Sequence, residues 1–141
     1  AAYYLSLMGH KVTIFEQRKQ LGGMLRYGIP NYRLPRKKLD DEIASILSTG
    51  IEVRKNVSVG VDVTIEELHK EYDAMYISIG AHADKKMGIE GEDLVGVYSA
   101  NEFLTRINLM KAYLDEYDTP IRGRICRIIQ ARKSLLSAAV M

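Results

Sequence analysis

The stretch LGGMLRYGIPNYRLP, residues 21–35, constrains the fold of this chain more than any other part of its sequence. Its apolar residues follow neither the period of a helix nor the alternation of a strand. Glycine lets a backbone approach a flat partner because it has no Cβ atom, and proline fixes φ. The stretch therefore predicts an irregular backbone shaped to lie against a ligand. For the pair Gly22-Gly23 alone, a plain turn is the alternative.

Patterns of helix and strand alternate on both sides of this stretch. Helices are expected at residues 1–8, 35–50, 64–72 and 99–113, and strands at residues 11–16, 51–53 and 74–79. Thr64 with Glu67, and Ser99 with Glu102, have the spacing of a capping box at a helix start. Alternating strands and helices predict an α/β fold with a parallel sheet.

Two residues at expected strand ends are candidates for ligand binding. Glu16 ends the strand at 11–16, and in dinucleotide-binding folds an acid at this place accepts hydrogen bonds from the adenosine ribose, about 20 residues after a glycine fingerprint. No such fingerprint precedes it in the chain, so a solvated acid is the alternative. Gly80 follows the strand at 74–79, where ligands of open α/β sheets lie, and an ordinary strand exit is the alternative.

Four basic residues crowd the start of the helix expected at 35–50: Arg33, Arg36, Lys37 and Lys38. The helix dipole disfavours cations there by roughly a few tenths of a kcal/mol each. Their placement indicates an anionic partner, either a diphosphate or an acidic protein, with a solvated helix end as the alternative.

Composition excludes several classes of function. Residues 1–120 hold 15 Lys and Arg against 18 Asp and Glu, a balance of −3, so nucleic-acid binding is not expected there. No apolar run approaches the ~18 residues of a membrane span, and no signal peptide is expected. Cys126 is the only cysteine and the three histidines share no ligand spacing, which excludes a disulfide and a cysteine-only metal or iron–sulfur site and makes any metal site unexpected. A lone cysteine without a signal peptide favours the cytoplasm.

Taken together, FEQRKQLGGMLRYGIPNYRLPRKKLDDEI resembles the FAD-binding segment of the glutamate synthase small-subunit type of FAD- and NAD(P)-dependent oxidoreductases. The resemblance continues through VSVGVDVTIEELHKEYDAMYISIGA and GIEGEDLVGVYSANEFLTRIN, and GGMLRYGIPNYRLP is its most specific block. It implies a partial Rossmann-like dinucleotide-binding domain with parallel strands over residues 1–120, without its first strand and its GxGxxG.

The resemblance implies a set of FAD-binding residues: Glu16, Gly22, Gly23, Met24, Arg33, Val59 and Gly80. By this resemblance Val59 would present backbone polar groups to the adenine edge, and Gly80 would abut the diphosphate. No side chain is expected to be catalytic, because the flavin does the chemistry.

The remaining roles follow from the same resemblance. Glu16 would hold the adenosine ribose, Gly23 and Met24 would line the cofactor, and Arg33 would lie close to the flavin or its diphosphate. The irregular stretch would then be one wall of the cofactor site.

In the family so resembled, a nicotinamide cofactor, usually NADPH, delivers hydride to FAD, and electrons leave singly through iron–sulfur clusters. NADPH and the clusters are expected on other parts of the full-length family and not on these residues. A large glutamate synthase-type subunit, or another electron-accepting subunit, is the expected partner. The isolated chain is expected to bind FAD weakly or not at all and to be inactive.

The last 21 residues do not fit the resemblance. Residues 121–141 hold five Arg and Lys, no acid, and no glycine after Gly123, where the family has a second glycine fingerprint. We interpret this basic tail as out of frame or as the start of a lost NAD(P)H domain, with a basic amphipathic helix as the alternative. A second functional hypothesis is a non-catalytic interaction module whose basic tail docks an acidic partner.

Overall fold

The computed structural model describes residues 1–111, 114 and 116. Within them, the chain forms two compact units. The first unit comprises Ala1–Arg26 and Tyr32–Ala81, and the second comprises Tyr27–Asn31 and the chain from His82 onward. The basic tail at 121–141 lies outside the described residues, so neither interpretation of it is tested.

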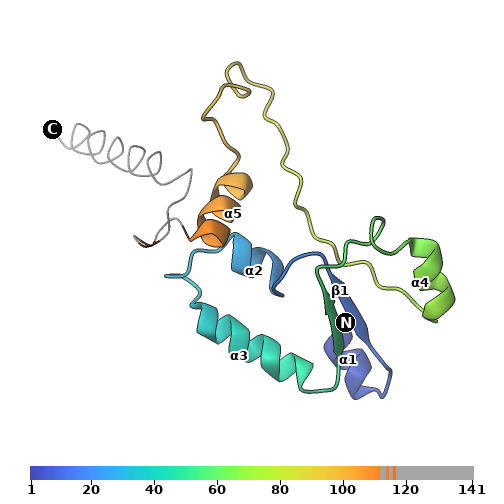
Figure 1. Cartoon of the computed structure of the whole chain (residues 1–141). Coiled ribbons are helices and arrows are strands. Elements are labelled where there is room, and N and C mark those ends of the chain that lie inside the picture. Colours follow the sequence, from blue (N-terminus) through green and yellow to red (C-terminus); the bar gives the residue numbers. More distant parts are fainter. Residues whose placement is uncertain (112–113, 115, 117–141) are drawn as a thin grey trace. The chain divides into compact units, whose positions relative to one another are not determined.

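Two strands lie among five helices along the described residues (Figure 1). In chain order they are α1 (Ala2–Leu7), β1 (Thr13–Glu16), α2 (Gly23–Tyr27), α3 (Arg36–Leu47), β2 (Glu52–Lys55), α4 (Ile65–Glu71) and α5 (Ala100–Met110). Six of these correspond to expected elements, with ends that differ by a few residues. No helix in this part of the chain is long and apolar enough to cross a membrane.

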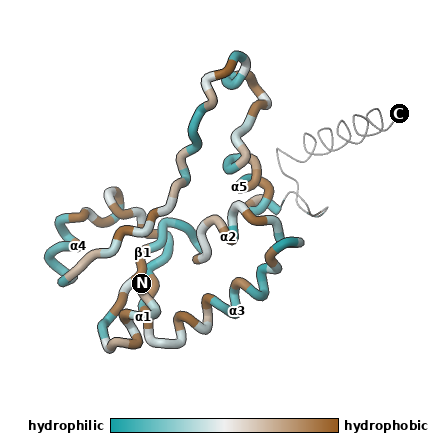
Figure 2. The backbone as a smooth tube through the Cα atoms, turned by 180° about the vertical axis from the view of Figure 1, so that it is seen from behind, coloured by the Kyte–Doolittle hydropathy of each residue, from teal (hydrophilic) through white to brown (hydrophobic). Residues whose placement is uncertain are grey.

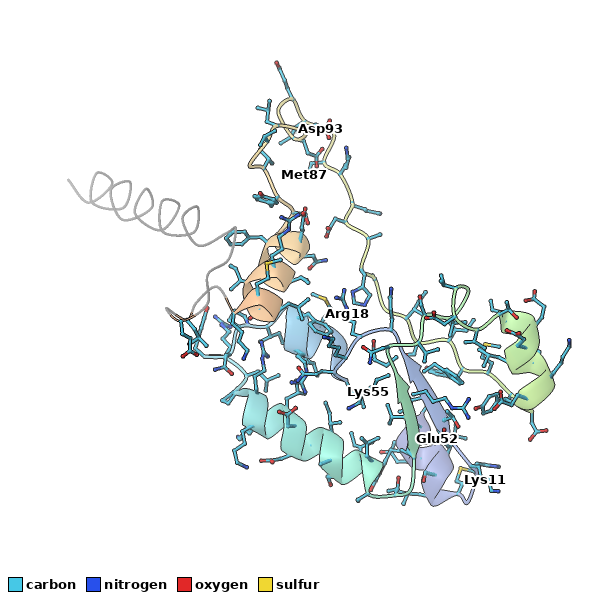
Figure 3. All side chains as sticks on the ribbon, viewed as in Figure 1. Lys11, Arg18, Glu52, Lys55, Met87 and Asp93 are labelled. Atoms are coloured by element: carbon cyan, nitrogen blue, oxygen red, sulfur yellow. The ribbon has the colours of Figure 1, made fainter. Side chains whose placement is uncertain are left out.

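β1 and β2 form the parallel pair that the sequence predicts. Glu16 at the end of β1 lies opposite Lys55 at the end of β2. Figure 3 shows Arg18 and Lys55 at this carboxyl end of the pair, and Lys11 and Glu52 at the other end. The α/β prediction with parallel strands is therefore confirmed.

The prediction of a strand at residues 74–79 is wrong. This segment forms no strand, and its apolar side chains are exposed: Tyr76 by 73%, Ile77 by 69% and Ile79 by 78%. A β-branched, apolar run favours a strand only where a neighbouring strand supplies hydrogen bonds and side-chain contacts. The described residues place no such neighbour beside it.

The prediction of an irregular backbone throughout residues 21–35 is wrong in one place, because α2 lies in the first half of this stretch. Met24, Leu25 and Arg26 are good helix formers, so a single turn forms between the glycine pair and the first proline. The rest of the stretch contains turns and no further helix or strand.

The two expected capping boxes differ in outcome. In the first, the Glu67 N–H donates to Thr64 Oγ1 at 3.2 Å, and the Thr64 N–H donates to Glu67 Oε2 at 2.8 Å. At α5 the Glu102 N–H donates to Ser99 Oγ at 3.1 Å. The Glu102 carboxylate pairs with Arg106 instead of closing the second box.

The core of the first unit is small. Leu39 of α3, Ile51 before β2 and Leu68 of α4 are its buried apolar side chains among the described residues. In the second unit Tyr27 is buried, and its carbonyl accepts a hydrogen bond from Asn108 Nδ2 at 2.8 Å.

Candidate functional site

Glu16 lies at the carboxyl end of β1, as the sequence predicts for a ligand-binding acid. Its side chain is half-buried, and Oε1 accepts a hydrogen bond from the Arg18 N–H at 2.8 Å. Among the described residues this is the only hydrogen bond of the carboxylate, so Oε2 is open to another donor. The site therefore offers a fixed carboxylate with one oxygen available.

The loop after β2 lies directly beside Glu16. The Val57 N–H donates to the Glu16 carbonyl at 3.1 Å, and the Asn56 N–H donates to the Arg18 carbonyl at 3.5 Å. Asn56 has φ +57°, a left-handed conformation that asparagine tolerates better than most residues. Val59 lies three residues after Asn56 and is 42% exposed. The structure thus brings Glu16 and the loop that carries Val59 together.

The two glycines of the pair have different surroundings. Gly22 has φ +119°, and a Cβ atom there would stand 3.1 Å from Leu39 Cδ2 and 3.4 Å from Arg26 Cβ. Gly23 has φ +48°, and no atom would lie within 4 Å of its Cβ. A side chain at Gly22 would therefore crowd Leu39, whereas the Cβ position of Gly23 is open. Met24, the next residue, is half-buried.

Arg26 is a residue of this region that the sequence reasoning missed. It is buried, its Nε–H donates to the Leu21 carbonyl at 2.6 Å, and its guanidinium pairs with Asp40 of α3. The available signal was an arginine inside an otherwise apolar turn, followed by two adjacent aspartates in the next helix.

The four basic residues at the start of α3 fall into two groups: some contact other residues of the chain, and the others are exposed without a partner among the described residues. Arg36 donates from Nη1 to a backbone carbonyl of α2 at 3.0 Å, and Lys37 pairs with Asp41 at 2.7 Å. Arg33 and Lys38 are exposed, and neither forms a hydrogen bond or ion pair with any described residue. Of the four basic residues in the described part of the chain, Arg33 and Lys38 therefore each keep a charge free to meet an anion.

Gly80 stands apart from the other candidates in the contacts it makes. It is exposed with φ +69°, and no hydrogen bond among the described residues links it to Glu16 or Val59. Both views show the chain after α4 running back past the carboxyl ends of β1 and β2 (Figures 1 and 2). Its segment therefore passes the correct end of the strands.

A metal centre has no support in this region. In the part of the chain that the structure describes, no three His, Cys, Asp or Glu side chains are grouped to hold a metal ion.

Known proteins are similar to this chain over most of its length, although no family model matches it. The chain is 48% identical over 111 residues to the NADP(+)-dependent formate dehydrogenase subunit beta of Moorella thermoacetica, which covers 77% of this chain and 16% of that protein. It is 40% identical over 118 residues to the glutamate synthase (NADPH) small chain of Mycobacterium tuberculosis, covering 84% of this chain and 24% of that one. Over this part of their length, the chain is similar to the small chain of glutamate synthase and to related oxidoreductase subunits.

Solved structures support the fold of this chain. FprA of Mycobacterium tuberculosis, in complex with NADPH, matches with a TM-score of 0.66 and 26% identity over 74% of this chain and 25% of that one. The prediction of a partial α/β dinucleotide-binding domain is confirmed. The chain spans about a quarter or less of the length of these relatives.

Proposed function

We propose that this chain forms one wall of the FAD site in an oxidoreductase that passes electrons from NADPH through FAD to iron–sulfur clusters. The observation that supports this most is the position of Glu16 at the carboxyl end of a parallel strand, with a free oxygen. An acid in this position binds ribose hydroxyls in dinucleotide-binding folds.

The described residues fit a flavin nucleotide in their chemistry. The Glu16 carboxylate accepts hydrogen bonds from ribose hydroxyls, and the backbone at Val59 offers polar groups to adenine. Arg33 supplies an unpaired cation for the diphosphate or the flavin, and Gly80 lets the chain pass close to the diphosphate. Bound FAD supplies the hydride-accepting ring, and these residues place it.

The open side of the Gly22-Gly23 turn receives the flavin in this proposal. Gly23 carries no side chain where the ligand approaches, and Met24 offers an apolar surface next to it. Gly22 contributes through packing, because it lets the turn lie against Leu39.

The proposed partners follow from the relatives, which are named as a small chain and as subunits beta. We propose a larger, electron-accepting subunit as the partner of the whole protein, NADPH as its electron donor, and the cytoplasm as its location.

Flavin binding by these 141 residues tests a further part of the proposal. The sequence holds Glu16 and the glycine pair but no GxGxxG, so we expect weak or absent FAD binding and no oxidation of NADPH. The visible absorbance spectrum of the purified chain, with and without added FAD and NADPH, measures both. A stoichiometric, yellow, NADPH-reducible protein would contradict the expectation.

Substitution of Glu16 tests the ribose contact. A hydrogen bond to a charged group contributes about 1.5 kcal/mol or more, so Glu16→Gln should weaken FAD binding by about tenfold in equilibrium dialysis. Glu66→Gln, which changes an exposed acid of α4, is the matched control and should leave binding unchanged. Equal binding by both variants would refute the assigned role of Glu16.

A further inference from the structure

The turn formed by Gly22 and α2 is too short to be stable by itself. α2 has five residues, and isolated helices shorter than about 12 residues are marginal in water. The start of this helix needs left-handed backbone at both Gly22 and Gly23, a conformation that glycine permits without preferring. Contacts from outside the turn must therefore stabilise it.

Arg26 ties this turn to α3. Only 7% of its surface is exposed, its Nε–H donates to the Leu21 carbonyl at 2.6 Å, and Nη2 pairs with the Asp40 carboxylate. A buried guanidinium is costly unless its charge and its N–H groups both find partners. Arg26 is therefore stable in this position only while the Leu21 carbonyl and Asp40 are both in place.

Two further contacts reach the turn from α3. Arg36 Nη1 donates to the Leu25 carbonyl at 3.0 Å, and Leu39 Cδ2 lies 3.1 Å from the point where a Cβ of Gly22 would stand. Arg36, Leu39 and Asp40 are three and four residues apart, so they share one side of the helix. One face of α3 thus holds both ends of the turn.

We infer that Arg26 is a positioning residue, which fixes the backbone from Gly22 to Met24 in the form that receives the flavin. The identity of the ligand rests on the proposed function, whereas the tie to α3 does not. Arg26 acts through the backbone, because its guanidinium is bound to Leu21 and Asp40. Lysine does not replace it, since one ammonium group lacks the rigid fork that reaches two acceptors.

Amide hydrogen exchange of the 141-residue chain without cofactor tests the tie. The reporter is the Leu25 N–H, which donates to the Gly22 carbonyl at 3.0 Å, and the reference is the Tyr72 N–H at the end of α4. Arg26→Met and Arg26→Lys should speed exchange at Leu25 by about tenfold relative to Tyr72. No change at Leu25, or equal acceleration at both amides, would overturn the inference.

Two adjacent aspartates of α3 provide a matched pair of variants. Asp40 pairs with the buried Arg26, whereas Asp41 pairs with the exposed Lys37. Asp40→Asn should speed exchange at Leu25, and Asp41→Asn should not. An equal effect of the two would mean that any loss of charge from α3 loosens the turn, and the specific role of Arg26 would be refuted.

Titration with FAD separates failure of this inference from failure of the proposed function. Arg26→Lys should weaken FAD binding by about tenfold and change the long-wavelength absorbance band of the bound flavin, while Asp41→Asn should do neither. If Leu25 exchange responds but all variants bind FAD equally, Arg26 holds the turn without positioning the flavin, and the inference fails alone. If the unsubstituted chain binds no FAD, the flavin role of Arg26 falls with the proposed function, and exchange still decides the tie.

Discussion

At the scale of single residues, Gly22 and Gly23 are glycines for different reasons. Gly22→Ala places a methyl group against Leu39 and keeps a left-handed φ, so it should lower the free energy of unfolding by about 2 kcal/mol or more. Gly23→Ala meets no atom and should cost only about 1 kcal/mol. Urea unfolding of the two variants measures the difference.

Gly50→Ala is the control for this pair, because Gly50 also has positive φ and open space around its Cβ. It should resemble Gly23→Ala in stability. A Gly22→Ala variant as stable as the Gly50→Ala variant would show that packing on Leu39 does not require glycine at position 22.

The sequence predicted individual residues of the site with uneven success. Glu16 was predictable because the end of a β-branched strand is a local signal, and its position is confirmed. Arg26 was not predictable, because its burial depends on Asp40, which is 14 residues away on another helix. Whether the seven candidate residues bind FAD stays a prediction.

At the scale of elements, α4 has a start that depends on pH. A hydrogen bond from the Thr64 backbone lowers the pKa of Glu67 below its ordinary value of 4.5. Because the folded pKa lies below the unfolded one, this stabilisation is present above about pH 4.5 and is lost as pH falls through the folded pKa. Glu67→Gln should remove this pH dependence. The measurement is the protection of the α4 amides, which is their exchange rate relative to an unstructured peptide at the same pH, between about pH 3 and 6.

The control for Glu67 is Glu66, a neighbouring exposed acid of the same helix turn, for which Glu66→Gln should leave the pH dependence in place. If the α4 amides of the unsubstituted chain were equally protected from exchange at both ends of this range, the ionised Glu67 carboxylate would contribute nothing to the start of the helix.

Elements with local signals were predictable, and those that depend on neighbours were not. The capping box at Thr64 depends only on residues three apart in the sequence, and it forms. The strand expected at 74–79 had a correct composition, but a strand also needs a partner, which sequence alone does not supply. α2 was missed because one helical turn between glycine and proline has too few residues to show a period.

At the scale of the whole molecule, the apolar segment at 74–79 has a consequence for association. Ile77 and Ile79 are largely exposed in an apolar, strand-like sequence that has no partner strand among the described residues, a combination that favours pairing between chains. The double substitution Ile77→Lys and Ile79→Lys should reduce self-association, as measured by light scattering across a concentration series.

Val61 provides the control for this prediction, because it is 82% exposed but lies in a loop. Val61→Lys should leave self-association unchanged. Equal association of the double variant and the unsubstituted chain would mean that this segment is not the surface through which copies meet.

The central claim is that the turn after β1 and the acid before it together bind a flavin nucleotide. Chemical-shift mapping by nuclear magnetic resonance, with FAD and with ADP as separate ligands, tests it most directly because weak binding still shifts amide signals. The account predicts that ADP shifts the amides around Glu16 and Val59, and that FAD additionally shifts Gly23 and Met24. FAD-induced shifts confined to α4 or α5, with Glu16 and Gly23 unmoved, would contradict it.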